Sequence, residues 1–140
     1  MVYLGLDLGS KTLGLAISDR TSTIATSLDV IRFNNYDELF NSLDSVVYLR
    51  KIDAFVLGNP LNLNGSESDR SKICYEFKQL LENRYPTKEV IMQDERLSTV
   101  EAQRLLISND ERRKNRKKVV DKIAASIILQ AYLDKRNHEK

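Results

Sequence analysis

The sequence predicts an α/β protein in which helices cover both faces of a mixed five-stranded sheet. Short apolar segments of strand length alternate with longer segments whose apolar residues recur at helical spacing, which is typical of this fold class. Only a turn separates the first two apolar segments, so we expect them to pair antiparallel, because a parallel crossover needs a dozen or more residues. The chain of 140 residues is long enough for one core, and we expect one domain over residues 1–140.

The first part of the chain is expected to hold three strands and then a helix. Residues 2–8 form an apolar run that stops at Gly9-Ser10, and residues 13–18 are its close partner in a hairpin. A third, less regular strand is expected over residues 23–33. Residues 37–51 carry apolar side chains every three or four positions, which predicts a helix.

The rest of the chain alternates between strands and helices. Gly58-Asn59-Pro60 ends one short apolar segment, and the pair Ser98 and Glu101 has the spacing of a capping box at the start of a helix. Ser66 and Asp69 have the same spacing before another helical segment. In chain order, the expected elements are a strand over 54–57, a helix over 72–84, a strand over 89–93, a helix over 98–107 and a helix over 119–133.

Composition excludes several classes of protein. With 41% hydrophobic and 30% charged residues, the chain does not have the composition of a disordered or low-complexity protein. Its longest apolar runs are shorter than the ~18 residues of a membrane helix, and its first residues lack the features of a signal peptide, so no membrane partner is expected. One cysteine, Cys74, and one histidine, His138, are too few for a Cys/His zinc site, and a reducing, cytoplasmic location is expected.

Positive charge is concentrated near the C-terminus, although the net charge of the chain is only +2. Residues 111–122 contain seven basic and two acidic residues, which gives this segment a local charge of +5. Such a block on a near-neutral body indicates a polyanionic partner such as nucleic acid. From charge alone, a solvated helix start that aids solubility explains the block equally well.

Carboxylates in unusual positions form the candidate site. Asp7 interrupts an apolar strand, where a charge is costly unless it is paired or binds a cation; a structural role in capping the turn is the alternative. Asp94 and Glu95 adjoin where a strand ends, so only one should face a site, and an ion pair with Arg96 is the alternative. Asp121 lies in the last helix beside small residues that allow close packing on a sheet, although an ordinary ion pair would also explain it.

These acids are separated by most of the chain, yet they could converge at one edge of the sheet. Oxygen ligands without His or Cys suit Mg²⁺ or Mn²⁺, and two such ions can activate water in phosphodiester cleavage. The basic block would hold the phosphate backbone. The residues therefore indicate an enzyme that carries out metal-dependent phosphodiester hydrolysis. The alternative is a protein that binds nucleic acid without catalysis.

Four motifs taken together resemble the YqgF/RuvX family, and the likeness extends from residue 3 to about residue 134. This resemblance implies a ribonuclease H-like fold related to Holliday-junction resolvases. It also implies a cytoplasmic nuclease that processes the 5′ end of precursor 16S ribosomal RNA. The motifs are GLDLGSKTLGLAISD at 5–19, GNPLN at 58–62 followed by Gly65-Ser66, DERLST at 94–99 with Glu101-Ala102, and Asp121 with Ala124-Ala125 and ILQ at 128–130.

The resemblance implies roles for single residues. The family's acidic site maps onto Asp7, onto Glu95 or Asp94, and onto Asp121, and we expect Asp7, Glu95 and Asp121 to hold the metal. Two departures stand out: Gly58-Asn59 occupies the place where related resolvases carry their second acid, and Thr12 stands where the family usually has Arg. Phosphate contacts are expected from Lys11, Arg96, Arg112, Arg113, Lys114, Arg116, Lys117 and Lys118.

The expected partner is structured RNA, with ribosomal precursor particles as its setting. Junction DNA is the nearest rival substrate, and the sequence does not separate the two. The first motif also looks like the phosphate loop of sugar kinases and Hsp70-type ATPases, but those need two lobes, which 140 residues cannot provide. A dimer would suit a symmetric junction, although no surface stripe in the sequence argues for one.

Overall fold

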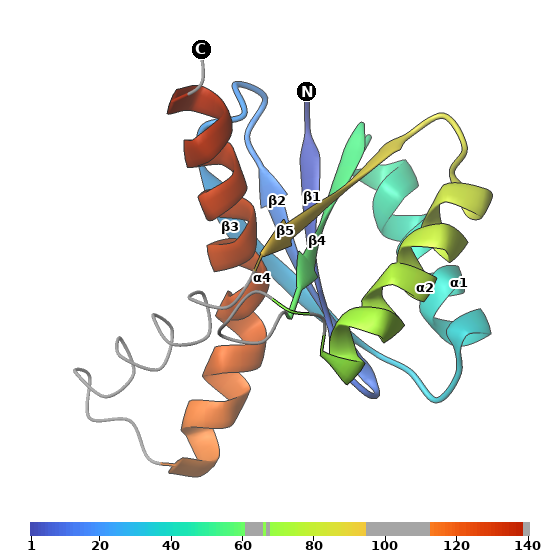
Figure 1. Ribbon diagram of the computed structural model, residues 1–140. Helices are drawn as coiled ribbons and strands as arrows, with labels where there is room; N and C mark the ends of the chain where they lie inside the picture. The colour runs from blue at the N-terminus through green and yellow to red at the C-terminus, as the bar shows by residue number, and fades with distance from the viewer. Residues whose placement is uncertain (61–65, 67, 95–112, 139–140) are drawn as a thin grey trace.

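The structure is a computed structural model that describes residues 1–60, 66, 68–94 and 113–138 (Figure 1). For residues 113–122 the description covers the backbone and not the side chains. The helix expected over 98–107 therefore lies outside the described residues. Among those residues, no helix is both long and apolar enough to cross a membrane.

The five strands form one mixed sheet in the order β3-β2-β1-β4-β5. The leading hairpin is antiparallel, with Leu8 opposite Leu13, and β3 continues it antiparallel to β2. Parallel pairing joins β1 to β4 and β4 to β5. The predicted mixed sheet and hairpin are thus confirmed. The strands are β1 (Tyr3–Leu8), β2 (Thr12–Ser18), β3 (Ala25–Arg32), β4 (Ala54–Asn59) and β5 (Glu89–Asp94).

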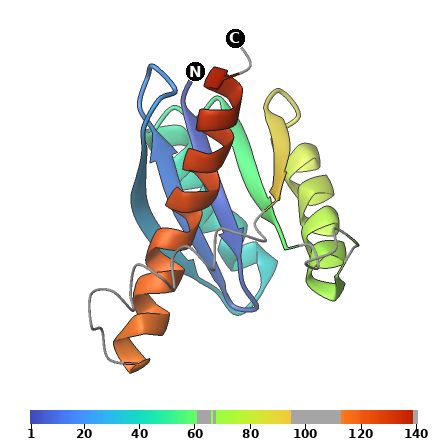
Figure 2. The ribbon, with the colours of Figure 1, turned by 60° about the vertical axis from the view of Figure 1, so that its left-hand side comes forward.

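Helices cover both faces of the sheet, as predicted. Helices α1 (Tyr36–Leu49) and α2 (Asp69–Arg84) lie on one face, and α4 (Arg113–His138) lies on the other (Figures 1 and 2). Buried residues accordingly form two clusters, one between the sheet and the α1/α2 pair and one between the sheet and α4. Alternation along β1 divides its residues between them: Leu4 and Leu6 face α1 and α2, whereas Tyr3 faces α4.

Two helices begin earlier than their apolar patterns predict. Helix α2 starts at Asp69 because Ser68, and not Ser66, is its N-cap: the Ser68 side chain accepts a hydrogen bond from the backbone N–H of Ser71 at 3.0 Å. Helix α4 starts at Arg113, within the basic block. The first turns of both helices are polar, and hydrophobic spacing cannot detect a polar turn.

Helix α4 lies unusually close to β1 at Gly5. A Cβ atom on Gly5 would lie 2.8 Å from Cβ of Leu129 and 3.0 Å from the carbonyl oxygen of Ala125. Both of these α4 residues are fully buried. The glycine therefore permits the backbone of α4 to rest directly on β1, and the predicted close packing of this helix on the sheet is confirmed.

Candidate active site

The parallel strands β1, β4 and β5 end at the same edge of the sheet, at Leu8, Asn59 and Asp94. We call this the carboxyl edge; it lies at the bottom of Figure 1. Between β1 and β4 the chain changes direction across the sheet, because β1 leads to β2 on one side and β4 leads to β5 on the other. In open α/β sheets, ligands bind outside the carboxyl ends of strands at such a switch point.

Asp7 lies at the carboxyl end of β1 and is the only charged residue of that strand. It is half-buried and is paired in register with Gly14 of β2. Alternation places Asp7 on the same face as Tyr3 and Gly5, which is the face that α4 covers. Asp7 therefore lies on a central strand, at the switch point, on the face of the sheet that α4 covers.

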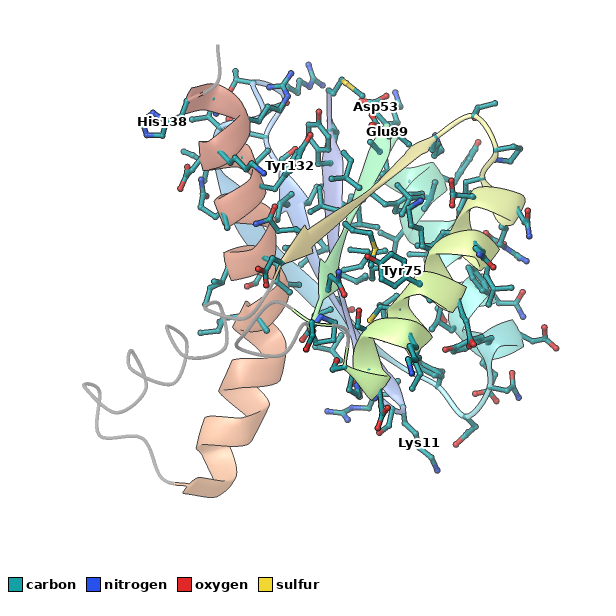
Figure 3. The ribbon with its side chains drawn as sticks, viewed as in Figure 1. Lys11, Asp53, Tyr75, Glu89, Tyr132 and His138 are labelled. Atoms are coloured by element: carbon teal, nitrogen blue, oxygen red, sulfur yellow. The ribbon has the colours of Figure 1, made fainter. Side chains whose placement is uncertain are left out.

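Helix α4 runs antiparallel to β1 across this face. Near the start of β1, the rings of Tyr3 and Tyr132 meet edge-on, with centroids 5.4 Å apart (Figure 3). Two residues further along β1, Gly5 faces Ala125 and Leu129, which lie earlier in the helix. Residues of β1 that lie nearer the carboxyl edge therefore pack against residues nearer the start of α4.

Extending this register brings residue 121 level with Asp7. Two strand residues span about 6.6 Å, which equals roughly four residues of helix. Asp7 is two residues beyond Gly5, and residue 121 is one helical turn before Ala125, on the same side of the helix. The backbone therefore places residue 121 level with Asp7 along the axis of β1, while the side chain of Asp121 lies outside the described residues.

Asp94 lies on the opposite face of the sheet from Asp7. Its register partner is Asn59, whose side chain points to α2, and Met92, two residues earlier in β5, packs with the α1/α2 cluster. Alternation therefore turns Asp94 toward α2, whereas Ile91 belongs to the α4 side. Glu95 and Arg96 lie outside the described residues.

Asn59 has a structural role at the place where related resolvases are expected to carry an acid. It is 6% exposed, and its side-chain oxygen accepts a hydrogen bond from the hydroxyl of buried Ser71 at 2.6 Å. This bond fastens the first turn of α2 to the end of β4. The amide therefore belongs to the packing of the carboxyl edge, and the departure noted in the sequence has a physical reason.

Basic residues occur on two elements near the carboxyl edge. Lys11 is exposed in the turn between β1 and β2 and projects away from the sheet (Figure 3). The first half of α4 extends beyond the edge, and this half contains part of the basic block (Figures 1 and 2). Arg112 and the side chains of the predicted phosphate-binding residues Arg113, Lys114, Arg116, Lys117 and Lys118 lie outside the described residues.

Sequence reasoning missed one basic residue at this edge. Arg70, in the first turn of α2, donates a hydrogen bond from Nη2 to the carbonyl oxygen of Leu8 at 2.6 Å. The signal that could have identified it is its position two residues after Ser68, in the first helical turn that follows β4. Because the apolar spacing predicted that α2 starts at residue 72, Arg70 was not recognised as part of its first turn.

Among the described side chains, no three Asp, Glu, His or Cys residues gather closely enough to hold a metal ion. Two of the three predicted ligands, Glu95 and Asp121, are outside that set. Asp7 is the described member of the predicted ligand set. Its carboxylate is a hard oxygen donor of the kind that Mg²⁺ and Mn²⁺ prefer.

Two carboxyl groups with lowered pKa values have structural roles elsewhere. The hydroxyl of Thr21 and the backbone N–H groups of Thr23 and Ile24 lower the pKa of Asp19 to about 2 and so stabilise the turn between β2 and β3. The Arg84 guanidinium lowers the pKa of Asp44 and links α2 to α1. Both groups lie outside the carboxyl edge.

Comparison with known families and curated proteins identifies close relatives. The family model described as "RuvX: Holliday junction resolvase" matches residues 1–135. A protein of Bacillus cytotoxicus is 46% identical over 136 residues, which cover 96% of this chain and 98% of the relative. A protein of Bacillus pumilus is 45% identical over 139 residues, which cover 98% and 100%. Both relatives are named "Putative pre-16S rRNA nuclease".

Solved structures of resolvases share the fold. The Holliday junction resolvase of fowlpox virus gives a TM-score of 0.56 at 20% identity, covering 96% of this chain and 99% of that one. RuvC of Thermus thermophilus in complex with a Holliday junction substrate gives a TM-score of 0.55 at 14% identity, covering 98% and 96%. At these identities the likeness concerns the fold alone, and it confirms the predicted ribonuclease H-like class.

Proposed function

Since this chain belongs to the RuvX family, as its motifs predicted, we propose that it is a metal-dependent endonuclease acting on structured RNA at the 5′ end of precursor 16S rRNA. Membership of this family and the names of the relatives identify the protein as a nuclease. The RNA substrate, the metal and the site residues are the proposed part, together with a role in ribosome biogenesis in the cytoplasm. The observation that carries the site is the placement of Asp7 on the α4 face of the carboxyl edge, level with residue 121.

We assign Asp7, Glu95 and Asp121 as the residues that hold Mg²⁺ or Mn²⁺. All three supply carboxylate oxygens, and the packing of Gly5 against Ala125 and Leu129 supports a shared location for the first and last of them. When bound, such ions supply an activated water and stabilise the leaving oxygen in phosphodiester hydrolysis. Asp7, fixed on a buried central strand, supplies the rigid part of the site.

Strand alternation favours Glu95 over Asp94 as the third acid. Asp94 turns toward α2, away from the α4 face on which Asp7 lies. Asp94 is accordingly the weaker candidate. It provides a useful control, because it carries the same side chain as Asp7 at the same edge.

The basic residues would hold the phosphate backbone of the substrate. The start of α4 brings its basic block beyond the carboxyl edge, and Lys11 lies at the tip of the hairpin on that edge. Arg96 follows Glu95 directly and would contact a phosphate beside the metal. Contacts of this kind give affinity without sequence specificity and make binding strongly dependent on salt.

Cleavage assays test this proposal. Wild type, Asp7→Asn and Asp94→Asn would be incubated with Mg²⁺ and either an RNA that spans the 5′ end of 16S rRNA in its precursor or a four-way DNA junction. We expect wild type and Asp94→Asn to cut the RNA, and Asp7→Asn to be slower by roughly 100-fold or more. Equal rates for Asp7→Asn and wild type would reject the assigned site.

Junction resolution is the second candidate function, because the structural neighbours include resolvases. Cleavage of the DNA junction with no cleavage of the RNA would favour it over the RNA substrate. If wild type binds both nucleic acids but cuts neither with Mg²⁺ or Mn²⁺, the chain is a binding module and the proposed catalysis is wrong.

A further inference from the structure

We propose that Arg70 is a substrate-binding residue, whose guanidinium contacts a backbone phosphate of the RNA at the carboxyl edge. This inference rests on the proposed function and adds a residue to it. It does not depend on the basic block of α4, because Arg70 lies on a different helix, at the other side of the edge.

The position of Arg70 is fixed by three hydrogen bonds. Its Nη2 atom donates to the carbonyl oxygen of Leu8 at 2.6 Å, and Leu8 directly follows Asp7. The helix turn that carries Arg70 is itself held by the Ser68 cap and by the bond between Ser71 and Asn59 at 2.6 Å. The guanidinium is therefore held on a rigid element, next to the end of β1 and beside the switch point.

The charge of Arg70 lacks an anionic partner among the described residues. A guanidinium has five N–H donors, and the one hydrogen bond found for Arg70 in that part of the chain is to a neutral carbonyl. The ion pairs found there join other residues. A half-buried cation whose charge meets no described anion is costly unless an anion arrives to meet it.

Arg84, at the other end of α2, shows what a structural arginine looks like in this protein. Its Nε donates to Oδ1 of Asp44 at 2.9 Å and its Nη2 pairs with the other carboxylate oxygen, so its charge is matched by two bonds. Arg70 has no such pairing with a described carboxylate. Because Arg binds phosphate through the same two-pronged geometry, a backbone phosphate is the anion that fits both the residue and the proposed substrate.

Salt-dependent RNA binding tests this inference. A short RNA from the 5′ end of precursor 16S rRNA would be titrated at several salt concentrations in EDTA, where binding is measured without cleavage. For Arg70→Gln we expect binding to weaken roughly tenfold, and the slope of log K against log salt to decrease in magnitude by about 0.7, the value of one phosphate contact. Arg70→Lys keeps the charge, so it should retain the slope while binding more weakly.

Arg50→Gln is the matched control, because Arg50 is exposed at the end of α1, away from the carboxyl edge, and the variant loses the same charge. If Arg70→Gln and Arg50→Gln change the slope equally, Arg70 is only a structural tie between α2 and β1, and the inference is overturned. Should Arg70→Gln not fold in urea titrations, a loss of slope in Arg70→Lys overturns it too. If wild type neither binds nor cuts the RNA, the proposed function fails, and the inference fails with it.

Discussion

Replacing Gly5 by alanine tests whether close packing of α4 on β1 positions the site. The added Cβ would lie 2.8 Å from Cβ of Leu129 and 3.0 Å from the Ala125 carbonyl oxygen. Carbon atoms in contact are normally about 3.5–4.0 Å apart, so α4 must move away from β1 by roughly 0.7–1 Å. Such overpacking in a buried layer costs about 1–3 kcal/mol, which a domain of this size should survive.

The same displacement should impair activity more than stability. Gly5 lies two residues before Asp7, and the α4 residues that it contacts, Ala125 and Leu129, lie about one and two turns after residue 121. Moving the helix therefore changes the distance between the two proposed ligands, and a misplacement of about 1 Å can cost on the order of 100-fold in rate. We expect Gly5→Ala to retain its fold in urea titrations while losing most of its cleavage activity.

Leu129→Ala is the control for this experiment. It removes a fully buried side chain from the same contact, but it leaves space and does not push the helix away. It should cost about 2–5 kcal/mol of stability, which is more than Gly5→Ala costs, and yet keep more activity at a temperature where both are folded. Wild-type activity in a folded Gly5→Ala would refute the link between helix packing and the site.

Two further predictions concern stability. Because the pKa of Asp44 is lowered in the folded state by Arg84, its stabilising effect is present above the ordinary carboxyl pKa of about 3.9 and is lost as the pH falls through the lowered value. Both side chains are partly exposed, at 40% and 43%, so Asp44→Asn should cost only about 0.5–1 kcal/mol at pH 7, and this difference should fade below pH ~3.9 in urea titrations. A difference that does not decrease as the pH falls below ~3.9 would contradict this assignment. Asn59→Ala should cost about 1–3 kcal/mol, because it leaves the buried hydroxyl of Ser71 without its acceptor, and adding Ser71→Ala should cost little more; additive losses would show that the bond does not hold α2.

The sequence predicted the centre of the sheet well because β1, β2 and β4 are short and mostly apolar. Residues 2–8 and 13–18 could be placed as a hairpin from loop length alone, and the sheet has that pairing. Helix starts were harder to predict. The first turns of α2 and α4 are polar, so the apolar spacing began three residues late in one and six residues late in the other. Ser68 was missed as the cap of α2 because Ser66 has the spacing of a capping box.

The site could be predicted only in part. Asp7 was identified by its charge within an apolar strand, which is a local signal. The choice between Asp94 and Glu95 depends on the face that Asp94 takes, and only the register of β5 on β4 provides that. Arg70 had only the weak local signal of its place in the first turn of α2, because its significance comes from the Leu8 carbonyl, 62 positions away in the chain.

Binding of Mn²⁺, measured by calorimetry without any nucleic acid, tests the central claim most directly. The account predicts that wild type and Asp94→Asn bind the ion with similar affinity, and that Asp7→Asn, Glu95→Gln and Asp121→Asn each lose most of it. If Asp94→Asn loses the ion while Asp121→Asn keeps it, the acids do not gather on the α4 face, and the proposed site is wrong.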